Sequence, residues 1–196
     1  MVENNIKVIE GKNKILVSAP HSVLHMRENN IRPREIKTGV MVKTLANKCH
    51  VYGIYKLKKE LNDANWDKVC RYKEKVKNIV SKEKIKAVID LHGMAAYRKQ
   101  DICIGINNGK NIYGYDNIVK VMVRVFKKNG FKNVTIDEPF NAKYEYCVSN
   151  YIARECNIPT FQIEINLKYR SKRYKESERY NQLIDALVEI INEKRF

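Results

Sequence analysis

The apolar run at residues 86–91 (KAVIDL) restricts the fold of this chain more than any other segment. Apolar residues recur with the 3.6-residue period of a helix before it, at residues 69–80, and after it, at residues 116–128. A continuous apolar strand between two helices is typical of a parallel sheet, because helices then cover both faces of the sheet. The run therefore predicts a central strand of an α/β fold.

Further strands and helices alternate along the chain, and this order predicts their layering. The turn residues at 11–13 separate the first two strands and favour a hairpin between them. The alternation indicates a three-layer fold with a mixed, mostly parallel central sheet and helices on both faces. We predict strands at residues 6–9, 15–17, 50–55, 86–91, 102–106, 133–136 and 160–165, and helices at about 38–48, 65–80 (beginning at Asn65 or Asp67), 116–128, 144–156 and 175–193.

Composition adds few constraints on the class of protein. The chain has 196 residues, 44% of them apolar, with no repeat, low-complexity segment or linker, so residues 1–196 are expected to form a single domain. The five cysteines are odd in number and include no CxxC pair, which indicates a reduced, cytoplasmic protein. No signal peptide and no run of roughly 20 apolar residues is evident, so we expect no membrane association.

The strongly basic charge concerns partners rather than fold. The 38 Lys and Arg residues against 22 Asp and Glu give a formal charge of +16, which favours a small anionic substrate or nucleic acid as partner. The basic residues are dispersed, however, and this also fits a solvated, lysine-rich surface. Nucleic acid is the less favoured partner, because no recognised motif interleaves aromatic and basic residues. A homo-oligomer is compatible with the sequence.

Two of the four histidines end predicted core strands. His21 follows the strand at 15–17 and His92 follows the strand at 86–91, and ligands bind at the carboxyl ends of strands in such sheets. Glu35 lies 14 positions after His21, just before a predicted helix, with Glu28 as its nearest competitor. Histidine and carboxylate are zinc ligands, so these three residues form a candidate metal site. The alternative is two unrelated loop histidines and a carboxylate that favours a helix start.

The strand 160-TFQIEIN-166 places polar residues on one face. Its alternation puts Gln162, Glu164 and Asn166 together, facing a cavity if the strand is central and solvent if it is at an edge. A carboxylate beside an activated water is the general base of a hydrolase, and Glu164 is the candidate. Asp90 could orient the imidazole of His92 from behind, or simply cap the adjacent turn.

Substrate contacts are predicted at four polar residues. Arg170 could bind a substrate carboxylate through two parallel hydrogen bonds, and Arg98 is a second candidate for that role. Asn166 and Asn65 complete the candidate set. A simpler interpretation is a solvated surface charge for Arg170 and turn chemistry for Asn65.

These segments together resemble the N-formylglutamate amidohydrolase-like proteins, which are related to zinc carboxypeptidases and aspartoacylase. The resemblance covers roughly residues 14–170. It rests on ordered short motifs: SAPHS at 18–22, an acidic residue shortly before Thr38-Gly39, DLHG at 90–93, DIxIG at 101–105, QIEIN at 162–166, and Tyr169-Arg170. The motifs are short, and their order and spacing make the resemblance specific.

The resemblance implies a phosphorylase/hydrolase-like fold and zinc-dependent hydrolysis of an amide bond. His21 and His92 match the family's metal histidines, Glu164 matches its catalytic acid/base, and Arg170 matches a carboxylate anchor. Thr38-Gly39 stands where the family carries a Thr-Asp pair, so Glu35 is the candidate third ligand. The expected function is hydrolysis of an N-acyl (N-formyl-like) amino acid or small peptide-like carboxylate, with one Zn²⁺ per chain. A basic anion- or RNA-binding module and a catalytically inactive relative are the alternatives.

Overall fold

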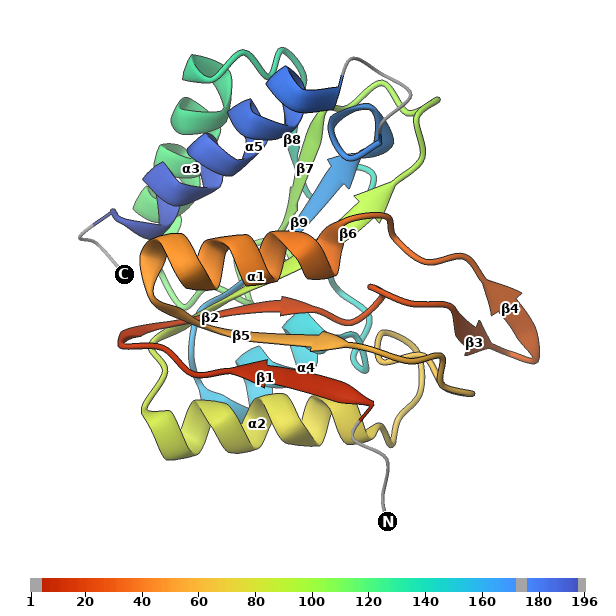
Figure 1. Cartoon of the computed structure of the whole chain (residues 1–196). Helices are drawn as coiled ribbons and strands as arrows, with labels where there is room; N and C mark the ends of the chain where they lie inside the picture. Colours follow the sequence, from red (N-terminus) through yellow and green to blue (C-terminus); the bar gives the residue numbers. More distant parts are fainter. Residues whose placement is uncertain (1–4, 172–175, 194–196) are drawn as a thin grey trace.

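The computed structural model describes residues 5–171 and 176–193 and has a central sheet between two layers of helices (Figure 1). The strands are β1 Ile6–Ile9, β2 Asn13–Ala19, β3 His25–Arg27, β4 Asn30–Arg32, β5 Val51–Lys56, β6 Ala87–Met94, β7 Ile102–Gly105, β8 Val134–Ile136 and β9 Thr160–Asn166. The helices are α1 Thr38–Cys49, α2 Arg71–Glu83, α3 Asp116–Lys128, α4 Val148–Cys156, α5 Glu176–Ile191 and the short 3₁₀ helix Leu167–Tyr169.

The sheet confirms the predicted mixed, mostly parallel architecture. Its strand order is β1-β5-β2-β6-β9-β7-β8. Strands β5, β2, β6 and β9 run parallel to one another at the centre, whereas β1 and β7 are antiparallel to their inner neighbours. The carboxyl ends of the four central strands therefore meet at one edge of the sheet, where α/β proteins bind ligands.

Two apolar cores hold the layers together. Helices α1, α3 and α5 cover one face and α2 and α4 the other (Figure 1). Successive side chains of β6 point to opposite faces of the sheet. Ile89 and Leu91 pack in the core under α1, α3 and α5, whereas Val88 packs in the core under α2 and α4. Asp90 and His92 have the same parity as Val88, so they face the layer of α2 and α4. The parts of the chain that the structure describes contain no helix long and apolar enough to span a bilayer.

The predicted hairpin at residues 11–13 is wrong. Strand β5 lies between β1 and β2, and the turn passes around its beginning, where the amides of Lys12 and Asn13 both donate to the carbonyl of His50. Gly11 permits this close passage, because an added Cβ would lie 2.4 Å from the carbonyl carbon of Val51. Turn residues indicate a reversal but do not show which strand fills the space that the reversal encloses.

Several predicted boundaries also need correction. Strand β6 continues through His92, which is a strand residue rather than the first loop residue. Helix α2 begins at Arg71, and Val69, predicted on its apolar face, is 85% exposed. Helix α4 begins at Val148 instead of residue 144, and the short hairpin of β3 and β4 falls in a segment where neither a strand nor a helix was predicted. The last helix was predicted from residue 175, which lies outside the described residues.

Candidate metal centre

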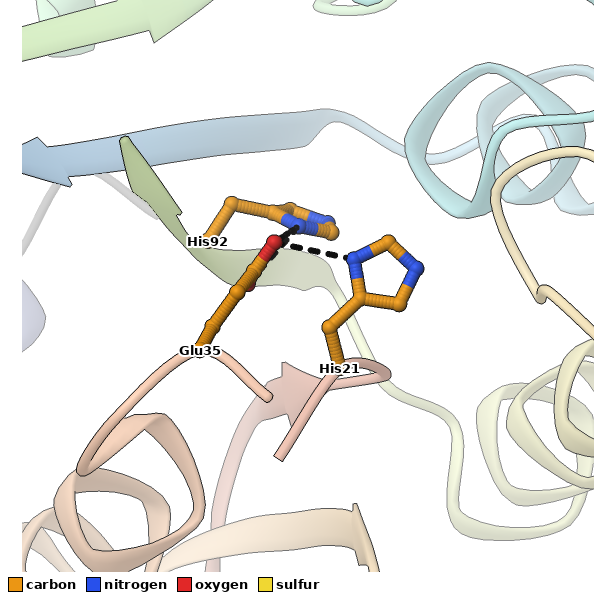
Figure 2. Close-up of side chains that lie close together, drawn as sticks. All are labelled: His21, Glu35 and His92. Atoms are coloured by element: carbon orange, nitrogen blue, oxygen red, sulfur yellow. Dashed lines mark hydrogen bonds and ion pairs between the residues drawn. The ribbon is translucent and has the colours of Figure 1, made fainter. Parts of the chain in front are cut away.

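Three elements deliver the three predicted metal ligands to one point. His21 follows β2, Glu35 precedes α1, and His92 lies near the end of β6, the neighbour of β2 in the sheet (Figure 2). The backbone amide of Glu35 donates to the carbonyl of His21 at 2.8 Å, which closes the loop between them. Strand pairing and this hydrogen bond together fix the relative positions of the three side chains.

The carboxylate of Glu35 lies between the two imidazoles (Figure 2). Its Oε1 is 2.9 Å from Nδ1 of His21, and its Oε2 is 3.2 Å from Nδ1 of His92. The three candidate donor atoms all lie within 4.8 Å of one another. The side chains of both histidines are almost fully buried, so this group of donors is rigid and largely shielded from water.

Each histidine is held from behind by a buried carboxylate. Nε2 of His21 lies 2.7 Å from Oδ1 of Asp63, and Nε2 of His92 lies 3.1 Å from Oδ2 of Asp90. A carboxylate on the outer nitrogen fixes the ring and its tautomer, which leaves Nδ1 as the inward-facing nitrogen that can bind a metal ion. The structure thus brings the predicted partner Asp90 to His92, and it supplies Asp63 as the equivalent partner of His21.

The charges of the cluster perturb its protonation strongly. Burial would lower the pKa of His21, but the charge of Glu35 and the hydrogen bonds to Asp63 and Glu35 outweigh it and raise that pKa. The pKa of His92 is raised well above its ordinary value for similar reasons, with Glu35 and Asp90 overcoming the effect of burial. The pKa of Glu35 falls because the two imidazoles outweigh its own burial. The carboxylates thus stabilise positive charge at this point.

Glu164 lies across the same pocket on the neighbouring strand. The register of β6 and β9 pairs it directly with His92. Gln162 and Glu164 line a pocket of about 390 Å³ that also includes the three candidate ligands, as the alternation of the strand predicts. Burial is the main reason that the pKa of Glu164 rises to about 7, with the charge of Glu35 adding to it and that of His92 opposing it. A carboxyl group with this pKa can both accept and donate a proton near neutrality.

The residues predicted to contact substrate occupy different surroundings. Asn65 lines the pocket, with Nδ2 3.1 Å from Nε2 of His92 and Oδ1 accepting the amide of Val148 at the start of α4. Asn166 is fully buried and donates Nδ2 to the carbonyls of Arg98 and residue 100. Its contacts thus hold a neighbouring loop, and Arg98 does not line this pocket.

Arg170 is a buried structural contact as well as a candidate anchor. Its guanidinium donates to the backbone carbonyls of Ile165, Ile36 and Met94. It also lies against Gly93, where an added Cβ would come 2.2 Å from Nη2. Three of its five N–H groups are therefore used within the protein, and its role as a carboxylate anchor stays a prediction.

Three further residues near the site carry weak or no sequence signals. Asp63 and Trp66 belong to a loop whose composition indicates a turn, and Arg27 lies on β3, in a segment without clear periodicity. Nε of Arg27 donates to Oδ2 of Asp63 at 2.7 Å, and its guanidinium stacks over Trp66. The Asp63-Ala64-Asn65 order is the one available signal, because alternate polar side chains there reach His21 and His92.

Comparisons with known proteins come from structure rather than sequence. No protein-family model matches the sequence, and no curated protein is similar to it in sequence. N-formylglutamate amidohydrolase from Ralstonia eutropha superposes with a TM-score of 0.67 over 97% of this chain and 98% of that chain, at 12% identity. The chain shares that protein's fold. A bacteriophage poly-gamma-glutamate hydrolase gives a TM-score of 0.62 over 95% of this chain and 86% of that chain, at 15% identity.

A metallo-carboxypeptidase also has this fold. The structure from Burkholderia cenocepacia gives a TM-score of 0.54 over 96% of this chain and 65% of that chain, at 9% identity. At such identities a likeness establishes architecture and not activity. The predicted fold class and the predicted resemblance to N-formylglutamate amidohydrolase and the zinc carboxypeptidases are therefore confirmed as a likeness of fold.

Proposed function

We propose that this protein is a zinc-dependent hydrolase that cleaves the amide bond of an N-acyl (N-formyl-like) amino acid or small peptide-like carboxylate. One observation carries the proposal: two imidazole Nδ1 atoms and one carboxylate converge, and each outer Nε2 meets a buried aspartate. Two histidines and a glutamate, with a fourth position left for water, form a common ligand set of catalytic zinc. The likeness of fold to an amidohydrolase, a poly-gamma-glutamate hydrolase and a metallo-carboxypeptidase supports the same class of reaction.

The donor set fits a divalent cation on chemical grounds. His21 and His92 would hold the ion through Nδ1 and Glu35 through its carboxylate, while Asp63 and Asp90 keep both rings in the tautomer that this requires. A bound Zn²⁺ would supply a Lewis acid that acidifies water and polarises the amide carbonyl. The same pocket leaves room beside the ligands for water and substrate.

Glu164 performs the proton transfers in this proposal. Its carboxylate takes a proton from the attacking water and then gives that proton to the nitrogen of the leaving amine, so the net reaction consumes one water and one amide. The burial that raises its pKa to about 7 makes both transfers accessible near neutral pH. Asn65, which lines the same pocket, would orient the substrate amide through its side-chain amide.

Metal analysis tests the first half of the proposal. After zinc reconstitution and gel filtration we expect one zinc ion per chain, and less than about a tenth of that in His21→Asn or His92→Asn, because each variant removes a direct ligand. His50→Asn is the matched control, since His50 is exposed at the end of α1, away from the candidate site. Equal zinc content in all four proteins would disprove the site.

Activity screening tests the second half. The zinc-loaded protein is incubated with N-formyl and N-acetyl amino acids and short peptides, and the released amine is quantified. Glu164→Gln should bind zinc normally but lose most of the turnover, whereas His50→Asn should keep both. Stoichiometric zinc without turnover on any member of the panel would favour the catalytically inactive alternative.

A further inference from the structure

A second pocket adjoins the first and shares a wall with it. The two pockets, of about 390 and 490 Å³, both include His21, Arg27, Glu35 and Gly93 among their lining residues. Beyond this wall they diverge, the first towards β9 and the loop before α4, the second towards β4 and the loop before α1. A molecule bound at the candidate metal ligands can therefore extend into both.

The second pocket is rich in guanidinium groups. Arg27, Arg32 and Arg34 line it, from the β3–β4 hairpin and the residues directly after it. Arg32 and Arg34 are exposed, and in the described part of the chain neither side chain has a hydrogen bond or ion pair to another residue. Nε of Arg27 already donates to Asp63, and Arg170, which also lines this pocket, uses three of its five N–H groups on backbone carbonyls. Arg32 and Arg34 thus have their full bidentate capacity available.

The first pocket has a different chemistry. Trp66 and Tyr144 stack with ring centroids 4.8 Å apart and line it together with Phe140. The hydroxyl of Tyr144 donates to the backbone carbonyl of Trp66, so the two loops that carry these rings are tied together. Aromatic surface favours an apolar or planar group. Apart from the two histidines of the candidate metal site, the basic residues that line this pocket are Arg27 and Lys143.

We propose that the substrate spans both pockets, with an acidic side chain held by Arg32 and Arg34 and an apolar or aromatic neighbour against Trp66 and Phe140. This inference rests on the proposed hydrolase function, and it specifies the substrate class. Because chain can continue on each side of the scissile amide, the substrate needs no free terminal carboxylate. Arg32 and Arg34 are then specificity-determining residues for an internal amide bond next to an acidic residue.

Doubly blocked dipeptides test this arrangement, because they have no terminal charge. Acetyl-Glu-Phe-amide and acetyl-Phe-Glu-amide are each compared with the glutamine isostere, by equilibrium binding with and without zinc and by mass spectrometry of the products. In one of the two orders, the glutamate peptide should bind about tenfold more tightly than its glutamine counterpart, as expected for a bidentate charge-assisted contact. That preference should decline with added salt, and the Glu–Phe or Phe–Glu bond should be the one cleaved.

Charge-removing variants assign the preference to the second pocket. Arg32→Gln combined with Arg34→Gln should bring the glutamate-to-glutamine ratio close to one. Lys120→Gln combined with Arg124→Gln removes the same charge from the exposed side of α3 and should leave the ratio unchanged. Equal binding of both isosteres, or a ratio that survives the first double variant, overturns the arginine assignment.

The outcomes also separate this inference from the proposed function. Hydrolysis of N-acyl amino acids but of no doubly blocked peptide overturns the spanning arrangement and leaves the hydrolase standing. A glutamate preference that depends on Arg32 and Arg34, in a protein that neither binds zinc nor cleaves any amide, supports the ligand pocket and overturns the hydrolase. Cleavage of the blocked peptides with the expected preference supports both.

Discussion

Replacing Asp63 with asparagine should weaken zinc binding although Asp63 is not a proposed ligand. The side chain is fully buried, and its two oxygens accept hydrogen bonds from Nε2 of His21 and Nε of Arg27, each at 2.7 Å. Oδ1 also accepts the amide of Asn65 at 2.8 Å. Asparagine has one accepting oxygen, so its NH₂ group would face an N–H of either His21 or Arg27, and two donors cannot bond each other.

The size of the effect follows from this geometry. Loss of a carboxylate behind a ligating imidazole costs about 10- to 100-fold in metal affinity, or about 1.4–2.8 kcal/mol at about 1.4 kcal/mol per tenfold change. We expect Asp63→Asn near the upper end. Asp90→Asn should cost less, because the contact of Asp90 with His92 is 3.1 Å and its Oδ1 has no hydrogen-bond partner. The amide nitrogen of the substituted side chain can take the place of that Oδ1, which leaves its oxygen to accept from the ring.

A competition titration with a chromophoric chelator measures these affinities, with thermal unfolding of the metal-free proteins as a check on folding. Asp185→Asn is the matched control, because Asp185 is exposed on α5 and remote from the site. If Asp63→Asn binds zinc within twofold of the parent protein, then Asp63 does not orient a ligand and His21 is not held for metal binding.

Three further predictions concern the same cluster. Glu164→Gln should lower kcat by about 10²- to 10⁴-fold with zinc affinity retained. In the parent protein kcat should fall as pH drops. The midpoint of that fall should lie at or below the pKa of about 7, because a bound cation favours the ionised carboxylate of Glu164. In the metal-free protein, the raised pKa of His21 contributes stability that is fully present below about pH 6.5 and is lost as pH rises through the folded-state pKa. The melting temperature should therefore decline over that pH range, and zinc affinity should rise. An equal decline of the melting temperature in Glu35→Gln would contradict this reasoning. Gly93→Ala should destabilise the protein by about 1–3 kcal/mol in denaturant unfolding, as overpacking does, because its Cβ would collide with Arg170, and the cost should shrink in an Arg170→Ala background.

The sequence patterns that succeeded are local. Apolar runs and period-2 alternation placed His92 and Glu164 at the ends of strands, and the parallel order of the sheet then brought them to neighbouring strands in register. His21 follows the same rule at the end of β2. A candidate site built from strand ends can be predicted without distances, because sheet geometry sets them.

The features that escaped prediction depend on contacts between distant segments. Asp63 lies 42 positions from His21, and its loop composition indicates only a turn. The start of α4 is fixed by Asn65, whose Oδ1 accepts the amide of Val148 at a separation of 83 positions. The hairpin prediction failed because β5, which comes later in the chain, lies between β1 and β2. In each case the deciding partner lies in another part of the chain, where neither periodicity nor turn propensity reports it.

Contacts between distant segments also fix Glu35, the third proposed metal ligand. The resemblance expects an acidic residue at position 39, but this chain has Gly39, where an added Cβ would lie 2.9 Å from Cβ of Ser22 and 3.0 Å from Cδ2 of Tyr55. A side chain larger than that of glycine does not fit there while α1 packs this closely on the turn after His21. Glu35 meets the need from one turn earlier, because the amide of Gly93 donates to its Oε2 at 3.0 Å and its own amide bonds the carbonyl of His21. A loop residue held at both its backbone and its carboxylate is as well fixed as a strand residue, which supports Glu35 as the third donor of the proposed site.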